Sequence, residues 1–156
     1  FTNTVLVNQN GEKLRFYSDL LKDRIVIINA FFTSCKGVCP TTMARLKKVQ
    51  DWLGTRLNRD VYILSLTVDP GRDTPVRLSE YARSLQPKPG WHLLSGEPDQ
   101  VEFMLKKLGQ YVDEPDAHTN LLILGNESTG LWKKAFVLAD WEDLIVVMES
   151  VLFDGV

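Results

Sequence analysis

Cys35 and Cys39 are the only two cysteines in this chain, so any sulfur chemistry occurs in the run from Phe31 to Pro40. Thiolates bind soft metal ions and exchange with disulfides. A disulfide between cysteines separated by only three residues would restrain few unfolded conformations, so it would add little stability. This spacing therefore directs attention to metal binding and thiol exchange.

The two cysteines are predicted to lie on a strand-to-helix turn. The apolar run from Ile25 to Phe32 is typical of a buried strand. Pro40 suits the first turn of a helix, because its missing N–H and preset φ cost little there. A helix N-terminus carries partial positive charge, which favours a thiolate over a thiol. We therefore predict that Cys35 lies in a loop and that Cys39 lies at or next to the helix N-terminus.

The chain has two histidines that could complete a metal site. His92 lies in the predicted strand Trp91 to Leu94 and is interpreted as a structural residue. His118 ends a polar loop that leads into the predicted strand Leu121 to Leu124. Two thiolates and one imidazole suit Cu(I), or Cu(II) with an added ligand, whereas structural zinc usually takes four protein ligands. The residues alone leave His118 open between a ligand and an ordinary loop histidine.

A second polar segment, Thr67 to Pro75, leaves a predicted strand at the sheet edge expected for the cysteines. Its proline and glycine can turn the chain, Asp73 and Thr74 can cap the next helix, and Arg72 can pair with an aspartate of the segment, Asp69 or Asp73. In a functional interpretation, Asp69 or Arg72 tunes the charge beside the thiolates. From the residues alone, the structural interpretation is favoured.

Apolar periodicity and turn residues predict alternating strands and helices along the chain. Asn10-Gly11 between two extended runs is typical of a β-hairpin. In chain order the predicted elements are a hairpin of Val5 to Val7 and Lys13 to Phe16, a helical turn at Ser18 to Lys22, a strand at Ile25 to Phe32, a helix from Pro40 to Leu57, a strand at Val61 to Val68, a helix from Pro75 to Leu85, a strand at Trp91 to Leu94, a helix from Pro98 to Leu108, a hairpin of Leu121 to Leu124 and Leu131 to Leu138, and a helix from Trp141 to Leu152.

This order predicts an α/β fold with helices on both faces of a mixed central sheet and an N-terminal hairpin. A thioredoxin-like fold fits best, and there the loop before the strand from Leu121 packs beside the dithiol. The length of 156 residues and 44% hydrophobic content predict a single domain, residues 1–156. A net charge of −2 without a basic stripe argues against nucleic acid as a partner. No apolar run approaches the ~20 residues of a membrane helix, so a membrane anchor would have to precede Phe1.

Three segments together resemble the Sco (SenC/PrrC-type) family of copper proteins. They are Cys35-Lys36-Gly37-Val38-Cys39-Pro40, Thr67-Val68-Asp69-Pro70-Gly71-Arg72-Asp73-Thr74-Pro75, and a lone His118 before a hydrophobic strand. The resemblance implies a thioredoxin-like domain that binds copper and serves assembly of the Cu(A) centre of cytochrome c oxidase. By motif position it implies Cys35, Cys39 and His118 as copper ligands, with Asp69 as a nearby acidic group.

The resemblance favours a copper chaperone as the function. Expected partners are cytochrome c oxidase subunit II or another copper protein, and a copper donor or a thioredoxin-like reductant. The expected location is the outer side of an energy-transducing membrane, in the bacterial periplasm, at the membrane surface or in the mitochondrial intermembrane space, with a membrane anchor outside this sequence.

Other functions remain open, and with them the question of whether the protein is an enzyme. The main alternative is a thiol-disulfide oxidoreductase that reduces a partner's cysteines through Cys35 and Cys39. A thiol peroxidase ranks last, because Ile28 and Phe32 stand where its Pro and Thr would be. A binding module with a structural disulfide is a further alternative.

Overall fold

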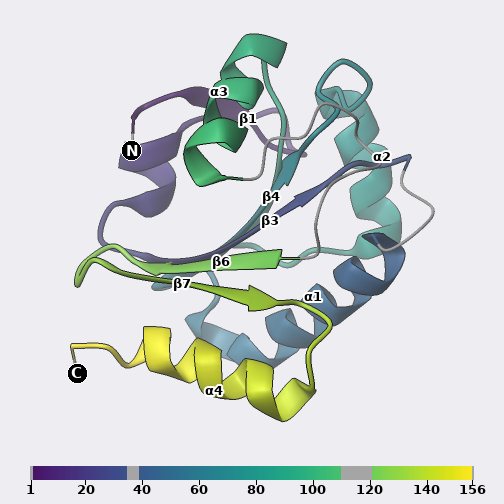
Figure 1. The fold of residues 1–156 in the computed structure, drawn as a ribbon. Helices are drawn as coiled ribbons and strands as arrows, with labels where there is room; N and C mark the ends of the chain where they lie inside the picture. Colours follow the sequence, from purple (N-terminus) through teal and green to yellow (C-terminus); the bar gives the residue numbers. More distant parts are fainter. Residues whose placement is uncertain (1, 35–38, 110–120, 156) are drawn as a thin grey trace.

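A five-stranded sheet with the order β5-β4-β3-β6-β7 forms the centre of the molecule (Figure 1). The structure, a computed structural model, describes residues 2–34, 39–109 and 121–155. Three neighbouring strands are parallel, namely β3 (Ile25–Phe31), β4 (Val61–Thr67) and β5 (Trp91–Leu94). Two further strands run antiparallel to their neighbours, namely β6 (Leu121–Asn126) and β7 (Leu131–Phe136). The predicted mixed sheet is confirmed.

Helices cover both faces of this sheet (Figure 1). Side chains from α1 (Cys39–Leu53), α2 (Pro75–Leu85) and α4 (Trp141–Leu152) belong to the buried cluster on one face. The cluster on the other face takes side chains from the hairpin of β1 (Val5–Val7) and β2 (Lys13–Arg15), the π-helical turn η1 (Phe16–Leu21) and α3 (Pro98–Leu108). The two-faced α/β arrangement and the N-terminal hairpin therefore match the prediction.

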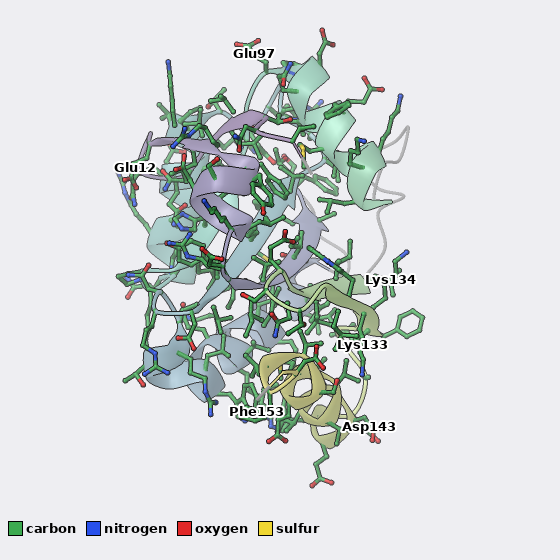
Figure 2. All side chains as sticks on the ribbon, turned by 90° about the vertical axis from the view of Figure 1, so that its left-hand side faces the viewer. Glu12, Glu97, Lys133, Lys134, Asp143 and Phe153 are labelled. Carbon is green, nitrogen blue, oxygen red and sulfur yellow. The ribbon has the colours of Figure 1, made fainter. Side chains whose placement is uncertain are left out.

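Charged side chains of both signs point outward from separate elements of the fold. Figure 2 shows Glu12 beside the hairpin, Glu97 before α3, Lys133 and Lys134 on β7, and Asp143 on α4. This mixture of signs accords with the small net charge of −2.

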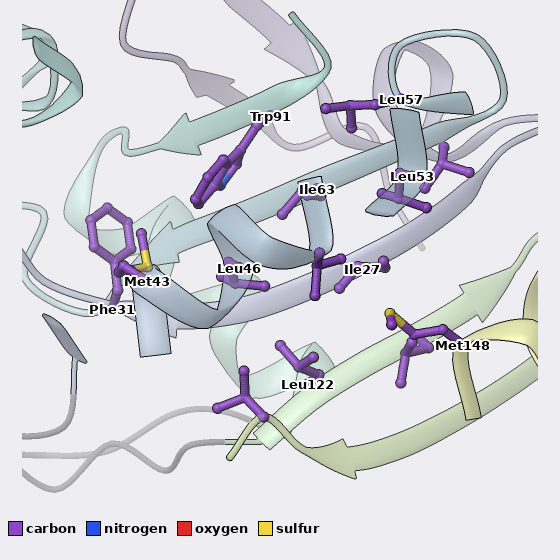
Figure 3. Close-up of a cluster of buried hydrophobic side chains, with 14 of the residues drawn as sticks. Ile27, Phe31, Met43, Leu46, Leu53, Leu57, Ile63, Trp91, Leu122 and Met148 are labelled. Carbon is purple, nitrogen blue, oxygen red and sulfur yellow. The ribbon is translucent and has the colours of Figure 1, made fainter. Parts of the chain in front are cut away.

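The core beneath α1 holds this helix against β3. Met43 and Leu46 of α1 are 2% and 0% exposed and belong to one cluster with Ile27 and Phe31 of β3 (Figure 3). Burying each such side chain contributes about 1.5 to 3 kcal/mol. The first half of α1 is thus packed against β3.

Several predicted boundaries were wrong by one to four residues. Helix α1 ends at Leu53 and not at Leu57, because Gly54 has φ = 56° and a short 3-10 turn, η2 (Gly54–Arg56), follows. Strand β2 ends at Arg15, because the next residue begins η1. Strands β3, β4 and β7 end one or two residues before the predicted ends, whereas β6 continues two residues further, to Asn126.

The strand directions bring the ends of several elements to one edge of the sheet. Strands β3 and β4 are parallel, so both end at this edge. Strand β6 is antiparallel to β3 and therefore begins there. Helix α1 starts at the same edge, after β3, and the first residues of α2 follow β4 (Figure 1).

Candidate metal centre

Cys39 is the first residue of α1, directly followed by Pro40. The prediction that this cysteine lies at the helix N-terminus is confirmed for the backbone. Cys35 and His118 lie outside the described residues, as does the side chain of Cys39. Within the part of the chain that the structure describes, no three His, Cys, Asp or Glu residues are grouped so that they could hold a metal ion. The ligand set of Cys35, Cys39 and His118 remains a prediction.

Asp69 and Arg72 belong to a tight turn after β4. The backbone N–H groups of Arg72 and Asp73 donate to the carbonyl oxygen of Asp69 at 3.1 and 2.9 Å. Arg72 Nε lies 3.8 Å from Asp69 Oδ2, and the arginine side chain is 73% exposed. The predicted pairing of Arg72 with an aspartate of the segment is therefore confirmed. Because the arginine is mostly exposed to solvent, this ion pair contributes little stability. A role for the pair beside the sulfurs remains a prediction.

Thr74 caps α2, whereas Asp73 has a different role from the predicted cap. Thr74 Oγ1 accepts a hydrogen bond from the backbone N–H of Arg77 at 3.3 Å, and Pro75 begins the helix. Asp73 is fully buried and its carboxylate is directed to the ends of β3 and β4. It accepts hydrogen bonds from the Thr33 N–H at 3.1 Å, from Thr33 Oγ1 at 2.5 Å and from Thr67 Oγ1 at 2.6 Å.

Arg77 extends this network to the residue before Cys35. Its Nε donates to Thr33 Oγ1 at 2.8 Å, and its Nη2 donates to Ser34 Oγ at 3.0 Å. Its Nε also lies 3.9 Å from Asp73 Oδ1. The sequence alone did not reveal this network, because its members come from two segments about 40 residues apart and meet only when β3 and β4 pair.

A second buried chain of polar side chains lies under the start of α1, and it too was not predicted from the sequence. Trp91 Nε1 donates to Ser65 Oγ at 3.0 Å, and Ser65 Oγ donates to Asn29 Oδ1 at 2.5 Å. Asn29 Nδ2 contacts the sulfur of Met43 at 3.7 Å, one turn after Cys39. These residues link three neighbouring strands to α1. The one signal in the sequence was Asn29 within an otherwise apolar run.

His92 has the structural role that the sequence predicted. Its ring lies 5.0 Å from the ring of Tyr62, and its Nδ1 lies 3.2 Å from Asn8 Nδ2. The neighbouring residues Trp91 and Leu93 belong to the core under α1, so His92 faces the opposite side of the sheet. His92 is thus separated from Cys39 by the sheet.

Comparison with known proteins gives one family for most of the chain. The model of the SCO1/SenC family matches residues 3–144, a range that includes both cysteines and both histidines. An SCO2-like protein of Rickettsia conorii is 35% identical over 102 residues, which are 65% of this chain and 47% of that protein. The chain spans about half the length of such curated relatives.

Solved structures agree with this family. BsSco, described as a member of the Sco family of cytochrome c oxidase assembly proteins with a disulfide switch, has a TM-score of 0.76 at 25% identity, over 96% of this chain and 92% of that chain. Bradyrhizobium japonicum ScoI with copper bound also has a TM-score of 0.76 at 25% identity, over 94% of this chain and 95% of that chain.

The names of related proteins indicate more than one cellular location. They include a mitochondrial SCO2 protein of Saccharomyces cerevisiae and a SCO1/SenC family lipoprotein of Bacillus anthracis. In this chain, none of the described helices combines the length and the apolar composition that a membrane crossing requires.

Proposed function

This chain belongs to the SCO1/SenC family, and we propose on that basis that it binds copper and delivers it to, or matures, the Cu(A) centre of cytochrome c oxidase. The observation that carries the proposal is the family match over residues 3–144, which spans Cys35, Cys39 and His118. Copper bound to the Bradyrhizobium japonicum relative supports copper as the cargo.

Cys35, Cys39 and His118 are the proposed copper ligands. Two thiolates suit soft Cu(I), and an imidazole adds the nitrogen donor that Cu(II) prefers. Cys39 begins α1, and the partial positive charge of a helix N-terminus stabilises a thiolate. Strand β6 follows His118 by three residues and begins at the edge where β3 ends. Asp69 and the exposed Arg72, which pair in the turn after β4, are proposed to adjust the charge around the site.

The proposed partners follow from copper transfer. The acceptor is cytochrome c oxidase subunit II or another copper protein, and the other partners are a copper donor or a thioredoxin-like reductant. We place the domain on the outer side of an energy-transducing membrane, held by an anchor outside this sequence. The mitochondrial and lipoprotein relatives support this location.

A thiol-disulfide oxidoreductase is the second candidate. The disulfide switch named for BsSco favours it, since the same two cysteines could pass electrons to a partner. In that reaction the Cys35 and Cys39 thiols would be oxidised to a disulfide, the partner's disulfide would be reduced to two thiols, and the two protons would go to the partner's sulfurs.

Anaerobic titration of the reduced protein with Cu(I) tests the proposed function. We expect a single tightly held copper ion per chain, and we expect Cys35→Ser or Cys39→Ser to abolish tight binding. His92→Gln is the matched control, because His92 lies on the far side of the sheet from α1. A reduced wild-type protein that binds no copper but reduces a disulfide substrate would reject the chaperone and establish the oxidoreductase.

A further inference from the structure

We propose that Asp73, Thr33 and Arg77 form a positioning network that fixes the Cys35 end of the dithiol segment. The inference rests on the proposed function, in which the two sulfurs must close on a single copper ion. It assigns a role in the site to three residues outside the proposed ligand set. Asp73 acts on the backbone N–H and the hydroxyl of Thr33, and Arg77 acts on the hydroxyls of Thr33 and Ser34.

Asp73 holds the ends of two strands together. Its buried carboxylate accepts both the backbone N–H and the hydroxyl of Thr33, two residues after the end of β3, and the hydroxyl of Thr67, the last residue of β4. Hydrogen bonds to a charged acceptor are stronger than neutral ones. The bond to the N–H of Thr33 fixes the chain itself, two residues before Cys35.

Arg77 binds two successive residues after β3, Thr33 and Ser34, with its forked guanidinium group. Two nitrogens of its planar guanidinium donate to the hydroxyls of Thr33 and Ser34. The arginine lies in the first turn of α2, whose start is fixed by the Thr74 cap. A lysine has the same charge but a single donor group, so it cannot span two successive hydroxyls in this geometry. The last fixed residue is therefore Ser34, directly before Cys35.

The Cys39 end of the segment has its own anchor. Cys39 is the first residue of α1, and Met43 and Leu46 pack this helix into the core. Asn29 also contacts the sulfur of Met43. The described residues on both sides of the dithiol segment are thus held, by hydrogen bonds at Thr33 and Ser34 and by core packing of α1. Closing two sulfurs on a metal ion, or on each other, then costs less conformational entropy than in a segment with one loose end.

The network predicts the same direction of change in two independent measurements. Arg77→Gln should lower the Cu(I) affinity about tenfold, as is typical when a residue that orients metal ligands is lost. It should also lower the equilibrium constant for forming the Cys35–Cys39 disulfide against glutathione about tenfold. Because the disulfide is then harder to form, the reduction potential of the pair should rise by about 30 mV. Ser34→Ala removes only one arm of the fork, so it should give a smaller loss in both.

Three further variants separate positioning from charge and from folding. Arg77→Lys should behave like Arg77→Gln if the fork matters, whereas Thr33→Ser keeps both the hydroxyl and the N–H and should behave like wild type. Arg83→Gln is the matched control, because Arg83 is an exposed arginine of the same helix and its side chain has no partner among the described residues. Thermal unfolding checks that each variant is folded.

Wild-type values for Arg77→Gln and Ser34→Ala in both measurements would overturn the proposal. Full recovery in Arg77→Lys would also overturn it, since charge alone would then account for the effect. The disulfide constant needs no copper, so it tests the network even if wild-type protein binds no copper and the proposed function fails.

Discussion

The side chain of Asn8 determines which ring nitrogen of His92 carries the proton. Asn8 Oδ1 accepts hydrogen bonds from the backbone N–H groups of Asn10 and Glu12, both at 3.0 Å. The amide nitrogen of Asn8 must therefore face His92 Nδ1 as a donor, and it also donates to Glu12 Oε1 at 2.9 Å. Nδ1 can accept only in a neutral ring with its proton on Nε2. The neutral form of His92 is the one that fits the fold.

The environment of His92 predicts that stability decreases in acid. Burial lowers the pKa of His92 below its ordinary value; Glu12 opposes this shift and Arg24 adds to it. The unfolded chain therefore binds a proton more readily than the folded chain. The free energy of unfolding should be highest above the ordinary pKa of about 6.5 and should fall as pH decreases below it, by up to about 1.4 kcal/mol per pH unit. Urea unfolding at a series of pH values measures this slope.

His92→Gln is the control for the acid effect, because glutamine can accept from Asn8 but cannot take up a proton. The difference between the wild-type and variant slopes gives the contribution of His92 to the pH dependence. His118 and the carboxylates contribute to both slopes and cancel. Identical slopes below pH 6.5 in the two proteins would show that His92 does not titrate between the folded and unfolded states.

Helix α2 is the element that connects the polar segment after β4 to the end of β3. The Thr74 hydroxyl satisfies one of the unpaired N–H groups at its start. Gln86, in the left-handed region at φ = 57°, ends it. Arg77 contacts Thr33 and Ser34 from the first turn, so a frayed helix start would also weaken the proposed positioning network.

Loss of the α2 cap should reduce stability by a measurable amount. We expect Thr74→Ala to lower the free energy of unfolding by about 1 kcal/mol, the usual effect of removing an N-cap side chain. Ser84→Ala, at an exposed position in the last turn of the same helix, should change it by less than about 0.5 kcal/mol. Chemical denaturation compares the two variants, and equal effects would mean that the cap is not stabilising.

The order and type of the elements were predictable because each depends on neighbouring residues. Asn10-Gly11 correctly predicted the first hairpin, and Pro75 and Pro98 correctly predicted the starts of two helices. The predicted end of α1 was wrong, because the pattern of apolar residues continues to Leu57 although Gly54 stops the helix. Periodicity records which side chains face the core, and it does not record where the backbone leaves the helix.

On the scale of the whole molecule, the contacts that the sequence did not reveal join distant strands. Asn29, Ser65 and Trp91 form one hydrogen-bonded chain only because β3, β4 and β5 are neighbours in a particular register. The same register brings Thr33 to Asp73. Pairing of this kind depends on global topology, and a single sequence carries little information on it. The three proposed ligands were found instead from residue type and from motifs.

Copper binding should stabilise the folded molecule if the ligands come from distant parts of the chain. Free Cu(I) at a hundred times its dissociation constant should raise the free energy of unfolding by about 2.7 kcal/mol, less any binding to the unfolded cysteines. Thermal unfolding of the reduced protein with and without Cu(I) measures this rise. Cys35→Ser should show little of it, and an equal rise in that variant would indicate copper bound elsewhere.

The Cu(II) absorption spectrum of His118→Ala, compared with that of His92→Gln, tests the proposed copper site most directly. Cu(II) prefers nitrogen donors and tetragonal geometry, so loss of a ligating imidazole should abolish or strongly alter the thiolate-to-Cu(II) charge-transfer band. His92 lies across the sheet from α1, and its variant should keep the wild-type band. An unchanged band in His118→Ala, or equal loss in both variants, would remove His118 from the site and leave a plain dithiol.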